Sequence, residues 1–221
     1  MSKITDFSKT IVALSTALGT GSIAVIRICG IDAISIVNDV FPGKNLLEAG
    51  GNTIHFGKIK NGDTEIDQVV ISLFKSPHSY TGENVIEVSC HANPLIIQEL
   101  IEVLVSRGAH HAGPGEFTLR AFLNGKIDLA QAEAISDLIT TKTKRGLQNS
   151  IDQLEGSLTG YLSDIKKKLI DILGLMEIDL DFSEEDLDVV SGQEIMKEIA
   201  IIQDKIARLI SRVRISTSKN A

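Results

Sequence analysis

The spacing of apolar residues changes near residue 128, and this change constrains the fold more than any other feature of the sequence. Before it, apolar residues come in short runs with a period of two, which indicates β-strands. After it, they recur at steps of three and four, which indicates α-helices. We therefore predict an α+β domain over residues 1–120, followed by an all-α helical bundle segment over residues 121–221.

The first domain is predicted to contain a sheet that is antiparallel at least in part. The triplet Asn61-Gly62-Asp63 separates two of the apolar runs. It predicts a β-hairpin, because Asn and Gly tolerate the positive φ that tight hairpin turns require. The runs that predict strands lie within residues 10–16, 22–30, 53–60, 66–74 and 85–91.

Two helices are predicted to interrupt these strands. The first lies near residues 32–41 and the second covers residues 94–107. The second has clear ends, with Asn93 as its N-cap, a proline at its first position and Gly108 as its stop.

The second domain is predicted to contain two long amphipathic helices whose apolar stripes form a bundle core. Ser191 and Glu194 form a capping box that predicts the start of the second helix. The acidic segment between the helices, residues 181–188, lacks the alternating ligand spacing of a calcium loop, so we interpret it as a solvated connector. The first stripe consists of Ile151, Leu154, Leu158, Tyr161, Ile165, Leu169, Ile172 and Met176, and the second of Ile195, Ile199, Ile202, Ile206, Leu209 and Val213.

Composition excludes several classes of protein. A formal charge of −7 argues against a chain whose main task is to wrap nucleic acid, which requires clustered Lys and Arg. The N-terminus has no apolar core of a signal peptide, and no apolar run is long enough to span a membrane. Cys29 and Cys90 lie in apolar runs without metal-ligand spacing, so we predict buried free thiols and a cytoplasmic protein.

Four stretches of the sequence are more specific than a generic α+β domain requires. The longest reads PGEFTLRAFLNGKIDLAQAEAISD, and a match of that length is improbable by chance. In their order and separation the four stretches closely resemble the MnmE (TrmE) family of tRNA modification GTPases, over residues 10–186. They are Gly21–Gly30, Ser79–Val88, Pro114–Asp137 and Asp181–Asp186.

The resemblance implies that the first domain has the aminomethyltransferase-type folate-binding fold, binds formyl- or methylene-tetrahydrofolate and forms a homodimer. The matching motif positions place the folate contacts on Arg27, Glu87 and Lys126. A carboxylate such as Glu87 suits the adjacent amino and ring N–H donors of a pterin, whereas Arg27 and Lys126 suit the carboxylates of the glutamate tail. Each residue also has a structural alternative: a surface glutamate, a buried ion pair and a solvated turn lysine, respectively.

In the family, GTP, Mg and K belong to a G domain that begins with a P-loop. The motif G-x-x-x-x-G-K-[ST] does not occur in these 221 residues, so we do not expect this chain to hydrolyse GTP. The resemblance further implies tRNA, modified at C5 of its wobble uridine, and the FAD-dependent protein MnmG (GidA) as partners. No catalytic residue and no metal ligands are predicted in the chain itself.

The sequence departs from the family pattern in two places. Where relatives carry a Pro-Pro-Gly-basic-Gly loop, this chain reads Ala17-Leu18-Gly19-Thr20-Gly21, without the basic residue. Where relatives tend to read His-Gly-Gly, it has His91-Ala92-Asn93, and a methyl group at Ala92 would crowd a closely approaching ligand. Both changes bear on folate affinity.

Two other functions remain open on the sequence alone. The chain could be a partner-docking scaffold with a vestigial folate pocket, because a truncated bundle exposes apolar surface. It could also be a one-carbon (aminomethyl) transferase, although that reaction needs a positioned acid or base and the sequence offers no candidate.

Overall fold

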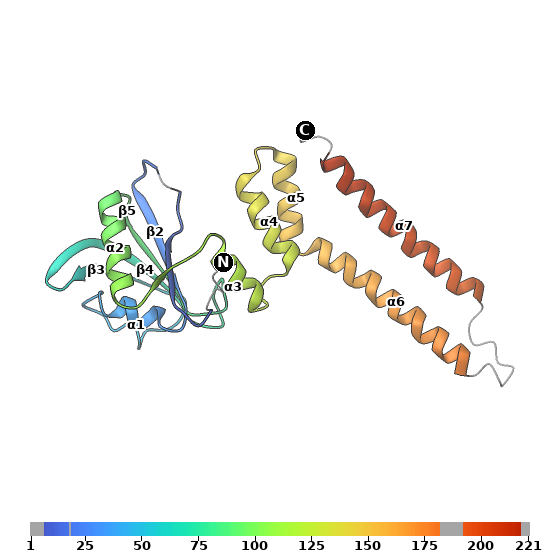
Figure 1. The fold of residues 1–221 in the computed structure, drawn as a ribbon, viewed down its shortest axis with the longest axis horizontal. Helices are drawn as coiled ribbons and strands as arrows, with labels where there is room; N and C mark the ends of the chain where they lie inside the picture. The colour runs from blue at the N-terminus through green and yellow to red at the C-terminus, as the bar shows by residue number, and fades with distance from the viewer. Residues whose placement is uncertain (1–6, 18, 182–191, 218–221) are drawn as a thin grey trace, which may run out of the picture. The chain divides into compact units, whose positions relative to one another are not determined.

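The computed structural model describes residues 7–17, 19–181 and 192–217. The chain divides into two compact units, Met1–Ser136 and Asp137–Ala221, which we describe separately (Figure 1). The division lies on the C-terminal side of the boundary that the sequence suggested between residues 120 and 121. The first unit is α+β and the second is entirely helical in its described part, as predicted.

The first unit is built on a six-stranded sheet with the order β3-β4-β5-β2-β1-β6. Neighbouring strands are antiparallel except β1 and β6, which are parallel. The strands are β1 (Ile11–Leu14), β2 (Ile23–Cys29), β3 (Thr53–Asn61), β4 (Thr64–Phe74), β5 (Val85–His91) and β6 (His110–His111).

The predicted hairpin is confirmed. Strands β3 and β4 pair in an antiparallel register in which Asn61 lies opposite Thr64. Gly62, one of the two residues between them, has a φ of 58°, which Gly adopts without steric cost.

Both predicted helices of the first unit are confirmed, as α1 (Ala33–Asn38) and α2 (Pro94–Ser106). Asn93 caps α2, since its side chain accepts a hydrogen bond of 2.9 Å from the backbone N–H of Leu95. Helix α3 (Glu116–Leu123) follows the short strand β6, and α4 (Leu129–Thr140) begins in the first unit.

The two faces of the sheet differ. The main core fills one face, where α1 and α2 pack on the strands, as Figure 1 shows for α2. The other face, which we call the open face, carries a smaller cluster of Ile11, Cys29 and Val85, against which Phe117 of α3 packs. Near the edge strand β3 the open face carries exposed apolar side chains, and these are Ile54, Phe56 and Val70.

The second unit contains α5 (Lys144–Leu154), α6 (Ser157–Asp181) and α7 (Gly192–Thr217). The prediction of a single helix running through residues 151–176 is wrong, because Gly156 has a φ of 83° and separates α5 from α6. The bundle core is confirmed in a reduced form. It consists of Ile165, Ile172 and Ile202, with Tyr161, Ile195 and Ile199 packed against them.

Two further predictions fall on residues outside the described ranges. Most of the acidic connector, residues 181–188, and Ser191 of the capping box lie there. The helix that the capping box was expected to open is present as α7.

Candidate functional site

Arg27 and Glu87 form an ion pair on the open face of the sheet. They lie directly opposite each other on the antiparallel strands β2 and β5. The Nε and Nη2 groups of Arg27 donate to Oε1 of Glu87 at 2.9 and 2.7 Å. Their side chains are 24% and 28% exposed, so the pair is partly desolvated but still open to a ligand.

Two aromatic rings flank the guanidinium of Arg27. Its Cζ lies 5.3 Å from the centre of the Tyr80 ring and 5.4 Å from that of Phe117. A guanidinium over an aromatic face is held by cation–π attraction. Because Glu87 and the two rings fix Arg27 together, the pair is a rigid platform whose carboxylate still has an open oxygen. Both bonds from Arg27 end on Oε1, and within the described residues Oε2 of Glu87 accepts no hydrogen bond.

Lys126 lies in a different hollow of about 580 Å³. Gly125, with a φ of 66°, ends α3 in the left-handed conformation. The side chain of Lys126 does not turn back over α3. It runs beside Gly82, and its Nζ donates to the carbonyl oxygen of Pro77 at 3.2 Å. The hollow is lined by Phe7, Ser8, Ile31, Ser76, Pro77, Gly82, Glu83, Asn84, Asn124 and Lys126.

The structure therefore brings two of the three predicted residues together. Arg27 and Glu87 are partners, whereas neither lines the hollow of Lys126. A single loop, residues 75–84, connects the two places: Tyr80 covers Arg27, and the carbonyl oxygen of Pro77 accepts the hydrogen bond from Lys126. The candidate site is thus a platform and a hollow that share one loop.

A buried charge cluster supports this loop. Arg120 is 1% exposed and bonds Glu116 through Nη2 and Glu83 through Nη1, each at 3.0 Å. Glu116 and Arg120 lie one helical turn apart, a spacing at which opposite charges pair on a helix. The role of Glu83 was missed. Nothing in its spacing distinguishes it from a surface glutamate, because its partner is 37 residues away.

Burial perturbs the ionisable groups of this cluster. Burial by itself would lower the pKa of Arg120, but the bonds to Glu116 and Glu83 outweigh it, so the pKa is raised and the guanidinium stays charged. The thiol of Cys29 donates to Glu83 at 2.9 Å. Burial and this carboxylate raise the pKa of Cys29 to about 12. Burial also raises the pKa of Cys90 to about 11, so both cysteines are buried free thiols, as predicted.

The two departures from the family pattern lie at one small hollow of about 210 Å³. Ala17 and Gly21 line it from one side, and Ala92 lines it together with the first turn of α2. None of Arg27, Glu87 and Lys126 lines this hollow. The departures therefore do not touch the candidate site directly.

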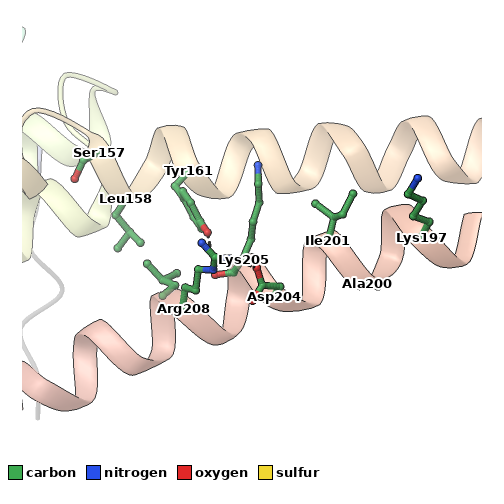
Figure 2. Close-up of a pocket in the computed structure, with 10 residues that line it drawn as sticks. Ser157, Leu158, Tyr161, Lys197, Ala200, Ile201, Asp204, Lys205 and Arg208 are labelled. Carbon is green, nitrogen blue, oxygen red and sulfur yellow. Dashed lines mark hydrogen bonds and ion pairs between the residues drawn. The ribbon is translucent and has the colours of Figure 1, made fainter.

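A further hollow, of about 890 Å³, is a groove between α6 and α7 in the second unit (Figure 2). Tyr161 crosses it, and its hydroxyl donates to the carbonyl oxygen of Lys205 at 2.9 Å. Leu158 of α6 and Ile201 of α7 give the groove an apolar lining, and Lys197 and Arg208 of α7 add charged side chains to it (Figure 2). Its walls are helix flanks that remain uncovered in this unit, and it contains no residue of the candidate site.

The described residues contain no group of three or more His, Cys, Asp or Glu side chains placed to hold a metal ion. Among the helices they form, none has both the length and the apolar character needed to cross a membrane.

Two family models match the chain. The model of the GTP-binding protein TrmE N-terminus matches residues 10–126, and that of the MnmE helical domain matches residues 129–218. The first covers the sheet, the ion pair and Lys126, and the second covers the helices from α4 onward.

Individual relatives agree with these models. The chain is 42% identical over 207 residues to the tRNA modification GTPase MnmE of Cytophaga hutchinsonii, which covers 94% of this chain and 45% of that protein. It is 42% identical over 205 residues to the MnmE of Chlorobium phaeobacteroides, covering 90% and 43%. It is 37% identical over 209 residues to the MnmE of Latilactobacillus sakei, covering 94% and 45%. The chain thus spans less than half the length of these relatives, and with both of its units matched it belongs to the MnmE family.

Proposed function

We propose that this chain is the folate-binding and dimerising module of a GTPase that modifies C5 of the wobble uridine of tRNA. The observation that carries the proposal is the Arg27–Glu87 platform, which leaves Oε2 of Glu87 open at a partly desolvated position. In this proposal the unit that contains the platform has the aminomethyltransferase-type fold, and the ligand is formyl- or methylene-tetrahydrofolate.

The chemistry of the platform fits the pterin end of a reduced folate. Oε2 of Glu87 can accept a hydrogen bond from the amino group or ring N–H of the pterin, while Arg27 holds the carboxylate in place through Oε1. Tyr80 and Phe117 already flank Arg27, so the surroundings include apolar ring surface as well as charge. The folate would supply a one-carbon unit to the reaction, and this chain would bind and orient it.

The glutamate tail of the folate is assigned to Lys126. The hollow that Lys126 lines contains the apolar side chains of Phe7, Ile31 and Pro77 beside polar groups. Arg27 suits the tail less well than the sequence suggested, because Glu87 already neutralises its charge. We therefore propose that Arg27 orients Glu87 and that Lys126 supplies the positive charge for the tail.

The remaining roles belong to the whole protein. We propose that GTP, Mg and K bind a G domain outside these residues, and that the intact protein acts on tRNA with MnmG in the cytoplasm. Homodimerisation is assigned to the exposed apolar side chains Ile54, Phe56 and Val70, which lie on the open face near its edge strand. A second copy that covered them would remove this apolar area from water.

Titration calorimetry with formyl-tetrahydrofolate tests the ligand site. We expect Glu87→Ala to weaken binding by about 10- to 100-fold, the range expected when a hydrogen bond to a charged group is lost. Glu65→Ala is the matched control, because Glu65 is also a strand glutamate paired with a strand cation, Lys58, but lies away from the platform. No binding by the native chain, or equal affinities of the two variants, would refute the assignment.

A specific observation also favours a second function, the docking of a helical partner. Apolar side chains remain exposed along α6, among them Leu169, Ile170 and Leu173, and the groove between α6 and α7 is unfilled. On this reading the second unit is a scaffold for a partner, and the folate site is vestigial.

A further inference from the structure

The loop of residues 75–84 is tied down from several sides. The hydroxyl of Tyr80 lies 3.1 Å from that of Thr118 in α3, and the side-chain amide of Asn124 donates to the carbonyl oxygen of Thr81 at 2.8 Å. Within the loop, the hydroxyl of Ser79 donates to the carbonyl oxygen of Glu83 at 2.6 Å. Most of these bonds are between neutral groups at or near the surface, and each contributes little by itself.

The bond from Arg120 to Glu83 is different, because it is charged at both ends and buried at one. Nη1 of Arg120 lies 3.0 Å from Oε2 of Glu83, and the Arg120 side chain is almost fully buried whereas Glu83 is 24% exposed. The same oxygen accepts the Cys29 thiol at 2.9 Å. A charge-assisted bond in a dry environment is stronger and more directional than a neutral one. Glu83 is therefore the anchor of the loop, and α3 and β2 hold it jointly.

Arg120 itself is fixed without Glu83. Its Nη2 donates to Oε1 of Glu116 and to the carbonyl oxygen of Lys9, and Glu116 accepts the backbone N–H of Gly113 at 2.7 Å. Its Nε is buried and has no hydrogen-bond partner among the described residues, so the bonds of the guanidinium to Glu83, Glu116 and Lys9 all come from the two Nη groups. The arrangement places one rigid positive group directly behind the loop.

We propose that Arg120 is a positioning residue for the ligand site. It acts through Glu83, which sets the loop so that Tyr80 covers Arg27 on one side and Pro77 accepts the bond from Lys126 on the other. One buried arginine thereby fixes the platform and the hollow relative to each other. The inference rests on the proposed ligand site, but the holding of the loop can be measured without any ligand.

The test compares Glu83→Ala with Glu83→Gln. The first removes the acceptor and leaves Arg120 paired with Glu116, so the fold is expected to persist, and the second restores an acceptor of nearly the same shape. The matched control is Ile71→Val, a mild core change on the face of the sheet occupied by the main core. Arg120→Met, which removes the guanidinium itself, is a further variant, and the test does not depend on whether this variant folds.

Two measurements are made on each variant. The first is amide hydrogen exchange of residues 76–84. The second is acrylamide quenching of tyrosine fluorescence in a Tyr161→Phe background, where Tyr80 is the only tyrosine and the chain has no Trp. We expect Glu83→Ala to raise exchange in this loop about tenfold, in line with the loss of a charge-assisted bond, and to raise quenching of Tyr80. Glu83→Gln keeps a neutral acceptor and should recover only part of both effects, and Ile71→Val should show neither.

Affinity for formyl-tetrahydrofolate then separates this inference from the proposed function. A native chain that binds no folate refutes the ligand assignment, while the exchange data still decide whether Arg120 and Glu83 hold the loop. If Glu83→Ala leaves the loop as protected as the Ile71→Val control does, the inference is wrong. It is also wrong if the loop loosens and folate affinity stays within twofold of the native value.

Discussion

At the residue scale, the cross-strand pairing of Arg27 with Glu87 explains how two charges occupy the middle of an otherwise apolar sheet. A charge on a half-buried strand is costly without a partner, and antiparallel pairing places one directly opposite. The sequence identified both residues and offered an ion pair as the structural alternative for Arg27. It could not identify the partner, because the register of strands 60 residues apart depends on the whole sheet.

Thiol reactivity follows from the same burial. The pKa of Cys29 is raised from 9.0 to about 12 and that of Cys90 to about 11, so neither forms an appreciable thiolate at pH 8 in the folded chain. We expect a thiol reagent such as iodoacetamide to modify both cysteines in denaturant and neither in the native chain. Rapid native labelling of either residue, located by peptide mass spectrometry, would contradict this.

The same shifts give stability a defined dependence on pH. Since the folded chain holds these protons more tightly than the unfolded chain, the stabilising contribution is fully present below about pH 9 and is lost as pH rises toward 12. A Cys29→Ala variant should therefore show a shallower fall in thermal stability above pH 9 than the native chain.

At the element scale, local patterns predicted most of the fold, and long-range pairings accounted for what was missed. The hairpin around Gly62 and the cap at Asn93 are made by residues adjacent in sequence, so turn and cap chemistry sufficed. Strand β6 was not among the predicted strands, because β1, with which it pairs in the described sheet, lies about 100 residues earlier. The break at Gly156 was overlooked because the apolar stripe continues across it, although a left-handed Gly is a common helix end.

The turn from β2 into α1 gives a prediction at this scale. Gly30 has a φ of 138°, and a Cβ built on it would lie 2.6 Å from the Cα of Thr10 in the neighbouring backbone. We expect Gly30→Ala to destabilise the first unit by at least about 2 kcal/mol, since both the φ and the contact are unfavourable. Gly50→Ala is the control, because its nearest neighbour would be the Thr53 methyl group at 3.7 Å. Urea denaturation should separate the two variants, and equal midpoints would contradict the prediction.

At the scale of the whole molecule, the chain presents two apolar surfaces that imply different associations. One is the patch around Phe56, which is 74% exposed on the open face of the sheet. The other is the flank of α6 that carries Leu173, which is 60% exposed. The apolar residues next to Phe56 and those next to Leu173 are exposed as well. Each surface is therefore a patch of the kind that a partner covers.

A pair of charge substitutions decides between them. If dimerisation uses the open face, Phe56→Glu should convert the dimer to a monomer in sedimentation equilibrium, while Leu173→Glu leaves it unchanged. The reverse outcome would place the dimer contact on α6, and a native chain that is monomeric at tens of micromolar would count against both surfaces.

The distance in sequence between Arg27 and Glu87 has a consequence for the order of folding. The β3–β4 hairpin closes locally and can form early, whereas β2 meets β5 only after a loop of 60 residues is closed, which is intrinsically slow. The platform therefore arises with the late, non-local pairings, and an intermediate with only the hairpin formed has no place for a ligand. Ligand capture in a refolding experiment would then report completion of the sheet, with a lag that follows the slowest strand pairing.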